Sequence, residues 1–153
     1  MCTSIGAGDA ILAAYPGVQH ARIAAGAPLP FSNAQFDIAF SNAVLEHVGS
    51  AALQRDFVNE MCRVARRVYI AVPNRLFPVE HHTALPLLHW LPKRWFRAIV
   101  RRTRFKFYGY EENLNHASGA QLRSWFPTDR IPRIAFTGIG LGFLRSNLVA
   151  FEP

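Results

Sequence analysis

Four polar residues lie at or just after the end of one predicted strand, close enough together to form a site. Residues 36–41, F-D-I-A-F-S, alternate in the period of a strand that is packed hard on one face, the Phe and Ile face. Ser41 and Asn42 stand at its carboxyl end, where open α/β sheets bind ligands. Glu46 and His47 follow on a short helical segment. Histidine titrates near neutral pH, so His47 suits a catalytic base or an acceptor-positioning group, beside Glu46. The alternative is that both residues only cap the helix.

A second polar group has the residue types of a metal site. It comprises Glu80, His81, His82 and His89. The adjacent histidines point in different directions on either a strand or a helix, and no second cluster supplies obvious partners. We therefore expect no metal site. We expect His81 and His82 to line a pocket over the sheet, and the alternative is a polar loop.

Other segments predict further strands. Each is a short apolar or β-branched run that ends at a loop signal, and they are residues 2–5, 18–24, 67–72, 131–137 and 146–151. The last two are joined by a glycine-rich turn, which predicts an antiparallel hairpin. Between two of the strands, residues 51–65 form an amphipathic helix, and a helix between strands predicts a parallel crossover. Leu53 is expected on its core face and Gln54 on its outward face.

Residues 75–115 have a different texture, rich in Pro, His, Trp and Arg, which predicts an insertion lying over the sheet. Seven cations and no acid lie within residues 93–106, among aromatic side chains, while the rest of the chain is balanced in charge. We call residues 89–108 the basic aromatic segment. It suits a lid with a solvated basic face, or a contact with an anionic membrane. Nucleic acid is not expected, because no recognised nucleic-acid module accompanies the segment. After the insertion, Ser118 and Gln121 predict a helix with a capping box.

Length and composition indicate one domain and a reducing compartment. The chain has 153 residues, half of them hydrophobic, which is enough for a single core. Cys2 and Cys62 are too few and too far apart for a disulfide scaffold. No apolar run approaches the roughly 20 residues of a membrane span, and the N-terminus does not have the profile of a signal peptide. We expect a cytoplasmic protein that is soluble or at most peripheral to a membrane.

The stretch L-P-F-S-N-A-Q-F-D-I-A-F-S-N-A-V-L-E-H-V, residues 29–48, resembles class I S-adenosylmethionine-dependent methyltransferases of the type 11 group. Turn, strand and following helix agree with that group in order and spacing. The resemblance implies a Rossmann-like α/β sheet, S-adenosylmethionine as the cofactor and methyl transfer as the activity. Residues 73–83, P-N-R-L-F-P-V-E-H-H-T, resemble a second segment of the subgroup. By that resemblance, His81 and His82 are expected to line the acceptor pocket, and Tyr108 at the end of the basic aromatic segment is a further candidate for acceptor contact.

In the register of the resemblance, the family's first strand and its glycine-rich loop have no counterpart. The expected fold is thus a partial methyltransferase sheet without that strand, which belongs in the middle of the sheet, and with an antiparallel C-terminal hairpin. Gly6 falls where an acid binds the ribose, with Asp9 nearby, and Ala25 falls where an acid contacts the adenine. The cofactor-binding residues implied for this chain are Asp9, Ser41, Asn42 and Ala43.

These observations predict methyl transfer to a small-molecule, glycan or lipid-linked acceptor, with weak binding of S-adenosylmethionine by this chain. The rival is a non-catalytic remnant that binds a membrane surface or a protein partner through the basic aromatic segment. Loss of a central strand leaves two sheet edges unpaired, so self-association is also expected.

Overall fold

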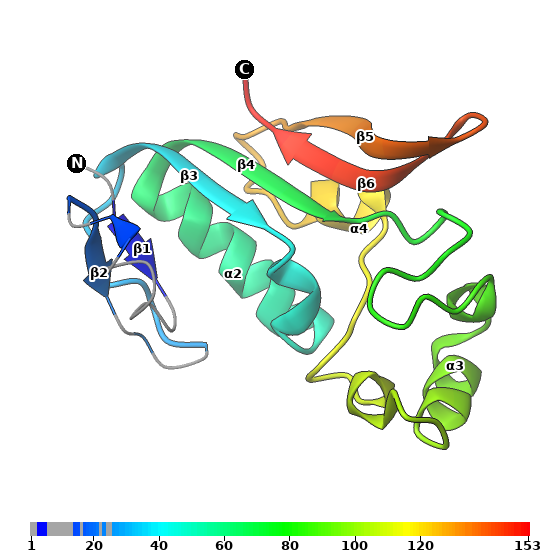
Figure 1. Ribbon diagram of the computed structural model, residues 1–153. Helices are drawn as coiled ribbons and strands as arrows, with labels where there is room; N and C mark the ends of the chain where they lie inside the picture. The colour runs from blue at the N-terminus through cyan, green and yellow to red at the C-terminus, as the bar shows by residue number, and fades with distance from the viewer. Residues whose placement is uncertain (1–2, 6–13, 16, 22, 24–25) are drawn as a thin grey trace.

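The strands of the computed structural model form two sheets (Figure 1), and the structure describes residues 3–5, 14–15, 17–21, 23 and 26–153. A two-stranded parallel sheet pairs β1 (Thr3–Ile5) with β2 (Gln19–Ala21). A four-stranded sheet has the order β3-β4-β6-β5. Its strands are β3 (Phe36–Asn42), β4 (Ala65–Pro73), β5 (Arg133–Leu141) and β6 (Leu144–Phe151).

The larger sheet combines a parallel pair with an antiparallel hairpin. β3 runs parallel to β4, so their carboxyl ends meet at one edge, where Asn42 is paired with Ala71. β6 lies antiparallel to both β4 and β5. The predicted α/β fold and terminal hairpin are confirmed. β3 is the last strand on its side, and no strand among the described residues pairs with its outer edge. Self-association through such edges stays a prediction.

Two capped helices cover one face of this sheet. In α2 (Ala51–Val64), the Ser50 hydroxyl accepts a hydrogen bond from the amide of Leu53 at the N-cap. α4 (Gly119–Ser124) begins with the predicted capping box of Ser118 and Gln121. Apolar side chains of both helices and of the sheet form the main core: Val58, Met61, Val68, Ile70, Val72, Leu122, Leu148 and Ala150. The core therefore lies between the two helices and the sheet.

The expected burial of β3 is wrong. Ile38 and Phe40 are 62% and 67% exposed, whereas Ser41 is buried and Ala39 packs against the core. The small side chains of Ala39 and Ser41 face α2, and small residues let a helix approach a sheet closely. On the opposite face, Phe40 stacks on Tyr69 with ring centroids 5.3 Å apart. The alternation was predicted correctly, but the helix packs on the small-residue side.

The insertion folds into short helical pieces without a strand among its described residues. They are two short 3-10 turns, η2 (Leu88–Trp90) and η3 (Lys106–Gly109), and one α-helix, α3 (Lys93–Val100). Phe96, Val100 and Leu114 form a small core of their own. α3 ends at Val100, and Phe107 in η3 is exposed. Among the described residues, no helix is long and apolar enough to cross a membrane.

Candidate functional site

The site begins where β3 ends. Ala43 has a left-handed backbone (φ 52°), and its amide donates to the carbonyl of Ala71 at 3.0 Å. Left-handed backbone is unfavourable for a residue with a Cβ, and such positions cluster at functional sites. The turn leads into η1 (Leu45–His47), in which Leu45 is fully buried in the main core. Anchored in this way, η1 carries Glu46 and His47 at the carboxyl edge of the sheet.

Two buried amides hold η1 in place. The side-chain amide of Gln54 donates to the carbonyls of Leu45 (2.9 Å) and Asn115 (2.7 Å). The backbone amide of Asn115 donates to the carbonyl of Glu46 (2.8 Å), and its side chain donates to the carbonyl of Gly49 (2.8 Å). Gln54 was expected to face outward, with Leu53 inward, but Gln54 is buried and Leu53 is exposed. Buried carbonyls need donors, and Gln54 supplies them.

Glu80 organises the other side of the site. Its carboxylate is buried and accepts hydrogen bonds from the amides of His82 (3.0 Å) and Thr83 (2.7 Å) and from the Thr83 hydroxyl (2.7 Å). It also contacts His82 Nδ1 at 2.9 Å and His116 Nε2 at 3.3 Å. Burial alone would raise the pKa of Glu80, but the hydrogen bonds from His116, His82 and Thr83 outweigh it, so the pKa is lowered. Glu80 is therefore an ionised acceptor, and it fixes the ring of His82.

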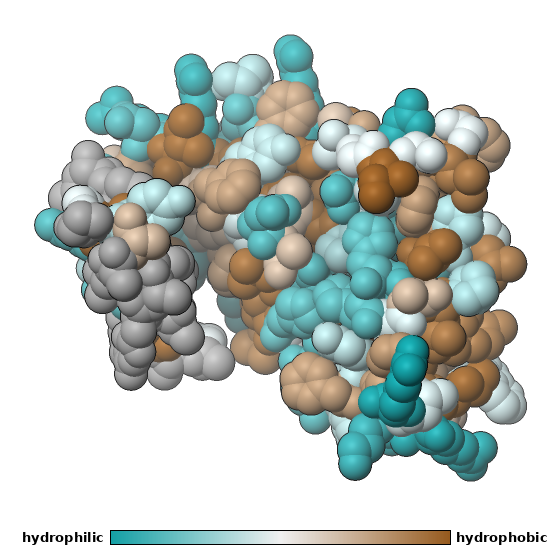
Figure 2. All heavy atoms as spheres, viewed as in Figure 1, coloured by the Kyte–Doolittle hydropathy of each residue, from teal (hydrophilic) through white to brown (hydrophobic). Residues whose placement is uncertain are grey.

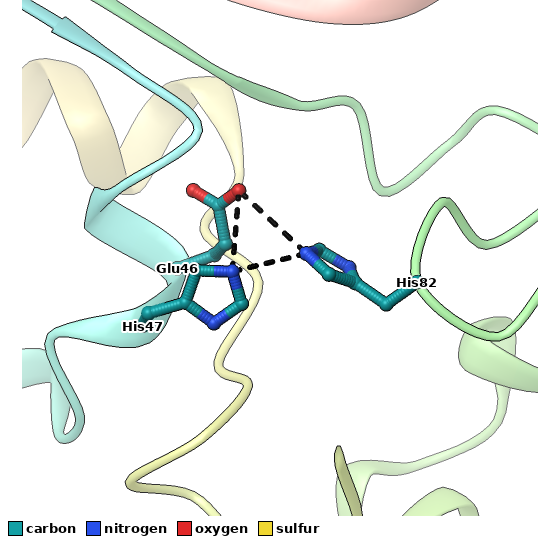
Figure 3. Close-up of side chains that lie close together, drawn as sticks. All are labelled: Glu46, His47 and His82. Carbon is teal, nitrogen blue, oxygen red and sulfur yellow. Dashed lines mark hydrogen bonds and ion pairs between the residues drawn. The ribbon is translucent and has the colours of Figure 1, made fainter. Parts of the chain in front are cut away.

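His47 and His82 meet edge to face across the site (Figure 3). Their Nε2 atoms are 3.0 Å apart. His47 Nδ1 lies 2.6 Å from the carbonyl of Asn113, which can only accept a hydrogen bond. His82 Nδ1 faces the carboxylate of Glu80, which also accepts. Each ring thus carries a proton on Nδ1, and in the neutral rings both Nε2 lone pairs face each other.

Glu46 points its carboxylate at this pair. It is 1% exposed, and neither of its oxygens has a hydrogen-bond partner. Oε1 is 4.0 Å from Nε2 of both His47 and His82, which is too far for a hydrogen bond (Figure 3). Burial raises the pKa of Glu46, and its own backbone amide and the charges of the neighbouring histidines only partly oppose that shift. A buried, unpartnered carboxyl at a ligand-binding edge marks a candidate functional group.

Of the residues predicted to contact an acceptor, His82 and Tyr108 lie together and His81 does not. The His82 ring is 5.1 Å from the ring of Tyr108. The exposed His81 instead faces Phe77, with ring centroids 5.9 Å apart. The two histidines do diverge, as adjacent side chains were expected to do.

The residues implied for the cofactor are partly described. Ser41 is buried, and its hydroxyl has no hydrogen-bond partner, while Asn42 is exposed beside it at the strand end. A hydroxyl and an amide at this edge fit the polar groups of a nucleotide-type cofactor. Asp9, like Gly6 and Ala25, lies outside the described residues.

Sequence reasoning missed the groups that complete the site. His116 and Asn115 come from an irregular segment more than thirty residues after His82, and no spacing links them to it. Glu80 was considered for a metal but not as the residue that orients His82. The E-H-H run was a usable signal for Glu80, because a carboxylate can accept from residues two and three positions later.

Two comparisons with known proteins point to methyltransferases. The model of a methyltransferase domain family matches residues 8–68. A crystal structure of an S-adenosylmethionine-dependent methyltransferase from Methanosarcina mazei superposes with a TM-score of 0.62 and 18% identity. That match covers 97% of this chain and 79% of the other, and at this identity it establishes the fold. The domain match and the shared fold both support the resemblance to class I methyltransferases that the sequence indicated. No curated protein sequence matches it.

The strand order β3-β4-β6-β5 agrees with the later strands of the expected sheet. β1 and β2 pair with each other in a separate sheet rather than with β3. The recognised family, its Rossmann-like fold and its enzyme class are confirmed. S-adenosylmethionine is the cofactor of the family.

Exchanging Gln54 for methionine tests what holds η1. Gln54→Met keeps the volume of the side chain but leaves the carbonyl of Asn115 without its donor, and the carbonyl of Leu45 keeps only the amide of Val48 at 3.2 Å. We expect the free energy of unfolding, measured by urea denaturation, to fall by about 1–3 kcal/mol. Arg55→Met on the exposed side of α2 is the matched control and should change it by less than about 0.5 kcal/mol. Equal effects of the two variants would contradict the assigned role of Gln54.

Proposed function

We propose that this methyltransferase transfers the methyl group of S-adenosylmethionine to a small-molecule acceptor, either a glycan or a lipid-linked intermediate. The observation that carries the proposal is the meeting of His47 and His82 at the carboxyl edge of β3, with Nε2 atoms 3.0 Å apart. Methyl transfer from a sulfonium is an in-line displacement, so the protein aligns the acceptor and removes its proton where the acceptor is weakly acidic. His47 is 36% exposed and is the proposed base.

Positions for the acceptor and for the cofactor would lie on either side of η1. Tyr108 and His82 bound the acceptor side, and the unpaired hydroxyl of Ser41 and the amide of Asn42 are offered to the cofactor. Bound S-adenosylmethionine supplies the electrophilic methyl group. The backbone turn at Ala43 separates the two sides.

A small cationic cleft next to the histidines suits an anionic group on the acceptor. Arg75, Lys93, Arg97 and His116 are among the residues that line it. Burial lowers the pKa of Lys93, and the nearby charges of Arg97 and Arg75 lower it further. An anion in this cleft would relieve that repulsion, as the phosphate of a lipid-linked intermediate would.

The activity is tested by following the labelled methyl group. We expect S-adenosylmethionine to bind with a dissociation constant weaker than about 1 mM by calorimetry, because glycine and alanine replace two acids of the family. At millimolar labelled cofactor, wild-type protein should label polyprenyl-phosphate-linked or free glycans. His47→Ala should lower that rate by about 10²–10⁴-fold, which is the usual contribution of a general base.

Exposed Arg66→Ala, far from the cluster, is the control and should retain the rate. A micromolar dissociation constant would contradict the expected loss of cofactor affinity. Absence of label from both acceptor classes at saturating cofactor would contradict the enzymatic proposal and favour the non-catalytic alternative.

A second proposal is that the basic aromatic segment rests on an anionic membrane. Trp90, Trp95 and Phe107 are exposed, and so are five of the seven cations. The other two are engaged, since Lys93 donates to Asn115 and Arg97 pairs with Glu111. Figure 2 shows hydrophilic side chains projecting beside hydrophobic ones at the lower right, where α3 lies in Figure 1. Exposed aromatic rings beside cations are typical of interfacial membrane contacts.

Vesicle sedimentation tests this surface. Each cation near an anionic bilayer contributes about 1 kcal/mol, so changing Arg94, Arg102 and Arg104 together to Gln should abolish sedimentation with phosphatidylserine vesicles at low salt. The far-ultraviolet spectrum should stay unchanged because Gln retains helix propensity.

The same charge change elsewhere is the control: Arg55, Arg66 and Arg123, all exposed outside the segment, replaced by Gln. This variant should still sediment with the vesicles. If wild-type protein ignores anionic vesicles at low salt, the segment is a lid with a solvated basic face, and the second proposal is wrong.

A further inference from the structure

The geometry points to a divalent transition-metal site formed by Glu46, His47 and His82, and we propose that this chain binds Zn²⁺ or a related first-row ion there. The inference goes beyond methyl transfer and does not rest on it, because the ion would bind whether or not the chain is active. It replaces our expectation from the sequence that the histidines form no metal site.

The lone pairs of two histidine rings point at the same place. His47 and His82 both donate through Nδ1, to the carbonyl of Asn113 and to the carboxylate of Glu80. Their unprotonated Nε2 atoms are then acceptors facing each other at 3.0 Å. Two acceptors at this distance repel unless a proton or a cation lies between them. A metal-binding histidine usually donates its other N–H to a carboxylate or a backbone carbonyl, and both rings here do so.

The carboxylate of Glu46 also indicates a cation at this place. Glu46 is nearly fully buried, both of its oxygens have no partner, and Oε1 points at the same spot (Figure 3). An ionised carboxylate in such a position requires a compensating charge. Near it the described residues supply the two histidines and no Lys or Arg within ion-pair distance. A divalent cation would satisfy the carboxylate and both lone pairs together.

The distances suit a small ion. The three ligand atoms are separated by 3.0, 4.0 and 4.0 Å. A tetrahedral zinc ion with bonds of about 2.0–2.2 Å needs ligand atoms about 3.3–3.5 Å apart, so sub-ångström side-chain shifts close the site. Two imidazoles and one carboxylate are a ligand set that zinc accepts, and they leave a fourth position open. His47 is 36% exposed, so solvent, or an acceptor, can reach that position.

Glu80 and His116 are not ligands of the proposed ion, and they surround the residues that are. His82 can offer Nδ1 to Glu80 and His116 or Nε2 to Glu46 and His47. Glu80 already accepts from Thr83 and from two backbone amides. Glu46 has no donor at all, so the uncompensated side of His82 is the Nε2 side. With an ion bound, acceptor activation by coordination would take over the proposed role of His47 as a base.

Titration of metal-stripped full-length protein tests the site. After removal of metals with a chelator, calorimetry with Zn²⁺ alone should give one ion per chain and a micromolar or tighter dissociation constant. Co²⁺ should give visible absorption bands of a low-coordinate site and compete with Zn²⁺. Millimolar Mg²⁺ should not compete, because this ligand set is too nitrogen-rich for Mg²⁺.

Three variants connect binding to the named side chains. His47→Ala alters a partly exposed residue and should weaken Zn²⁺ binding by at least about 100-fold, and Glu46→Gln should do the same. His81→Ala is the matched control on the neighbouring residue, whose ring faces Phe77, and should change the affinity by less than about twofold. Glu46→Gln should also raise the melting temperature of the metal-free protein, because it removes a buried charge that has no partner.

Three results would overturn the proposal. The first is the absence of Zn²⁺ binding tighter than millimolar to a folded wild-type protein, which would leave a shared proton between the histidines. The second is one-to-one binding that His47→Ala leaves unchanged, which would place the ion elsewhere. The third is an equal loss of affinity in His81→Ala. None of these measurements uses S-adenosylmethionine or an acceptor, so failure of the metal site and failure of methyl transfer are distinguishable.

Discussion

The buried amides of Gln54 and Asn115 are the constraint on which the site depends. η1 is one short turn between β3 and α2, and its own hydrogen bonds cannot fix it. Asn115 bonds to Glu46 and Gly49, Gln54 bonds to Leu45 and Asn115, and Lys93 of α3 donates to Asn115. A single residue therefore joins η1, α2 and the insertion. Each of these carbonyls would cost about 1–3 kcal/mol if it were left buried without a donor.

The fold could be predicted from the sequence where local patterns decide it. The strands, α2, the capping box of Ser118 and the terminal hairpin all follow from apolar periodicity and turn residues. Two faces were predicted wrongly, since Ile38 and Phe40 are exposed and Gln54 is buried. Periodicity shows that a strand or helix has two faces, but the neighbouring elements decide which one is covered. The large side chains of β3 lie on a face that α2 and α4 do not cover.

The candidate site could be predicted only where a local sequence pattern marks a residue. Glu46 and His47 follow a strand end, and that position alone identified them. His82 was found by resemblance, but its meeting with His47 depends on how the insertion returns over the sheet. His116 and Asn115 have no local signal, because their roles arise only from contacts between segments far apart in the chain. The sequence predicted no metal site, because the spacing within residues 80–89 could not show that Glu46 and His47 lie beside His82.

A carboxyl buried without a partner is unfavourable, and a folded chain tolerates it where it serves a site. Glu46 lies at the edge of the sheet where this fold binds ligands, next to two imidazoles whose free nitrogens face each other. One positive charge between these three groups would satisfy all of them. A proton supports acid–base catalysis by the histidine pair, and a divalent cation supports coordination of the acceptor. Both occupants depend on the same arrangement of Nδ1 donors and Nε2 acceptors.

The tautomers of His47 and His82 test that arrangement most directly. Nitrogen-15 NMR of ¹⁵N-histidine-labelled protein, assigned with His47→Ala and with a His82 variant, distinguishes protonated from unprotonated ring nitrogens. In metal-free protein at mildly alkaline pH, the account predicts a proton on Nδ1 and none on Nε2 of both rings, and Zn²⁺ should shift both Nε2 signals and leave the Nδ1 protons in place. A proton on Nε2 of either neutral ring, or Nε2 signals that Zn²⁺ does not move, would contradict it.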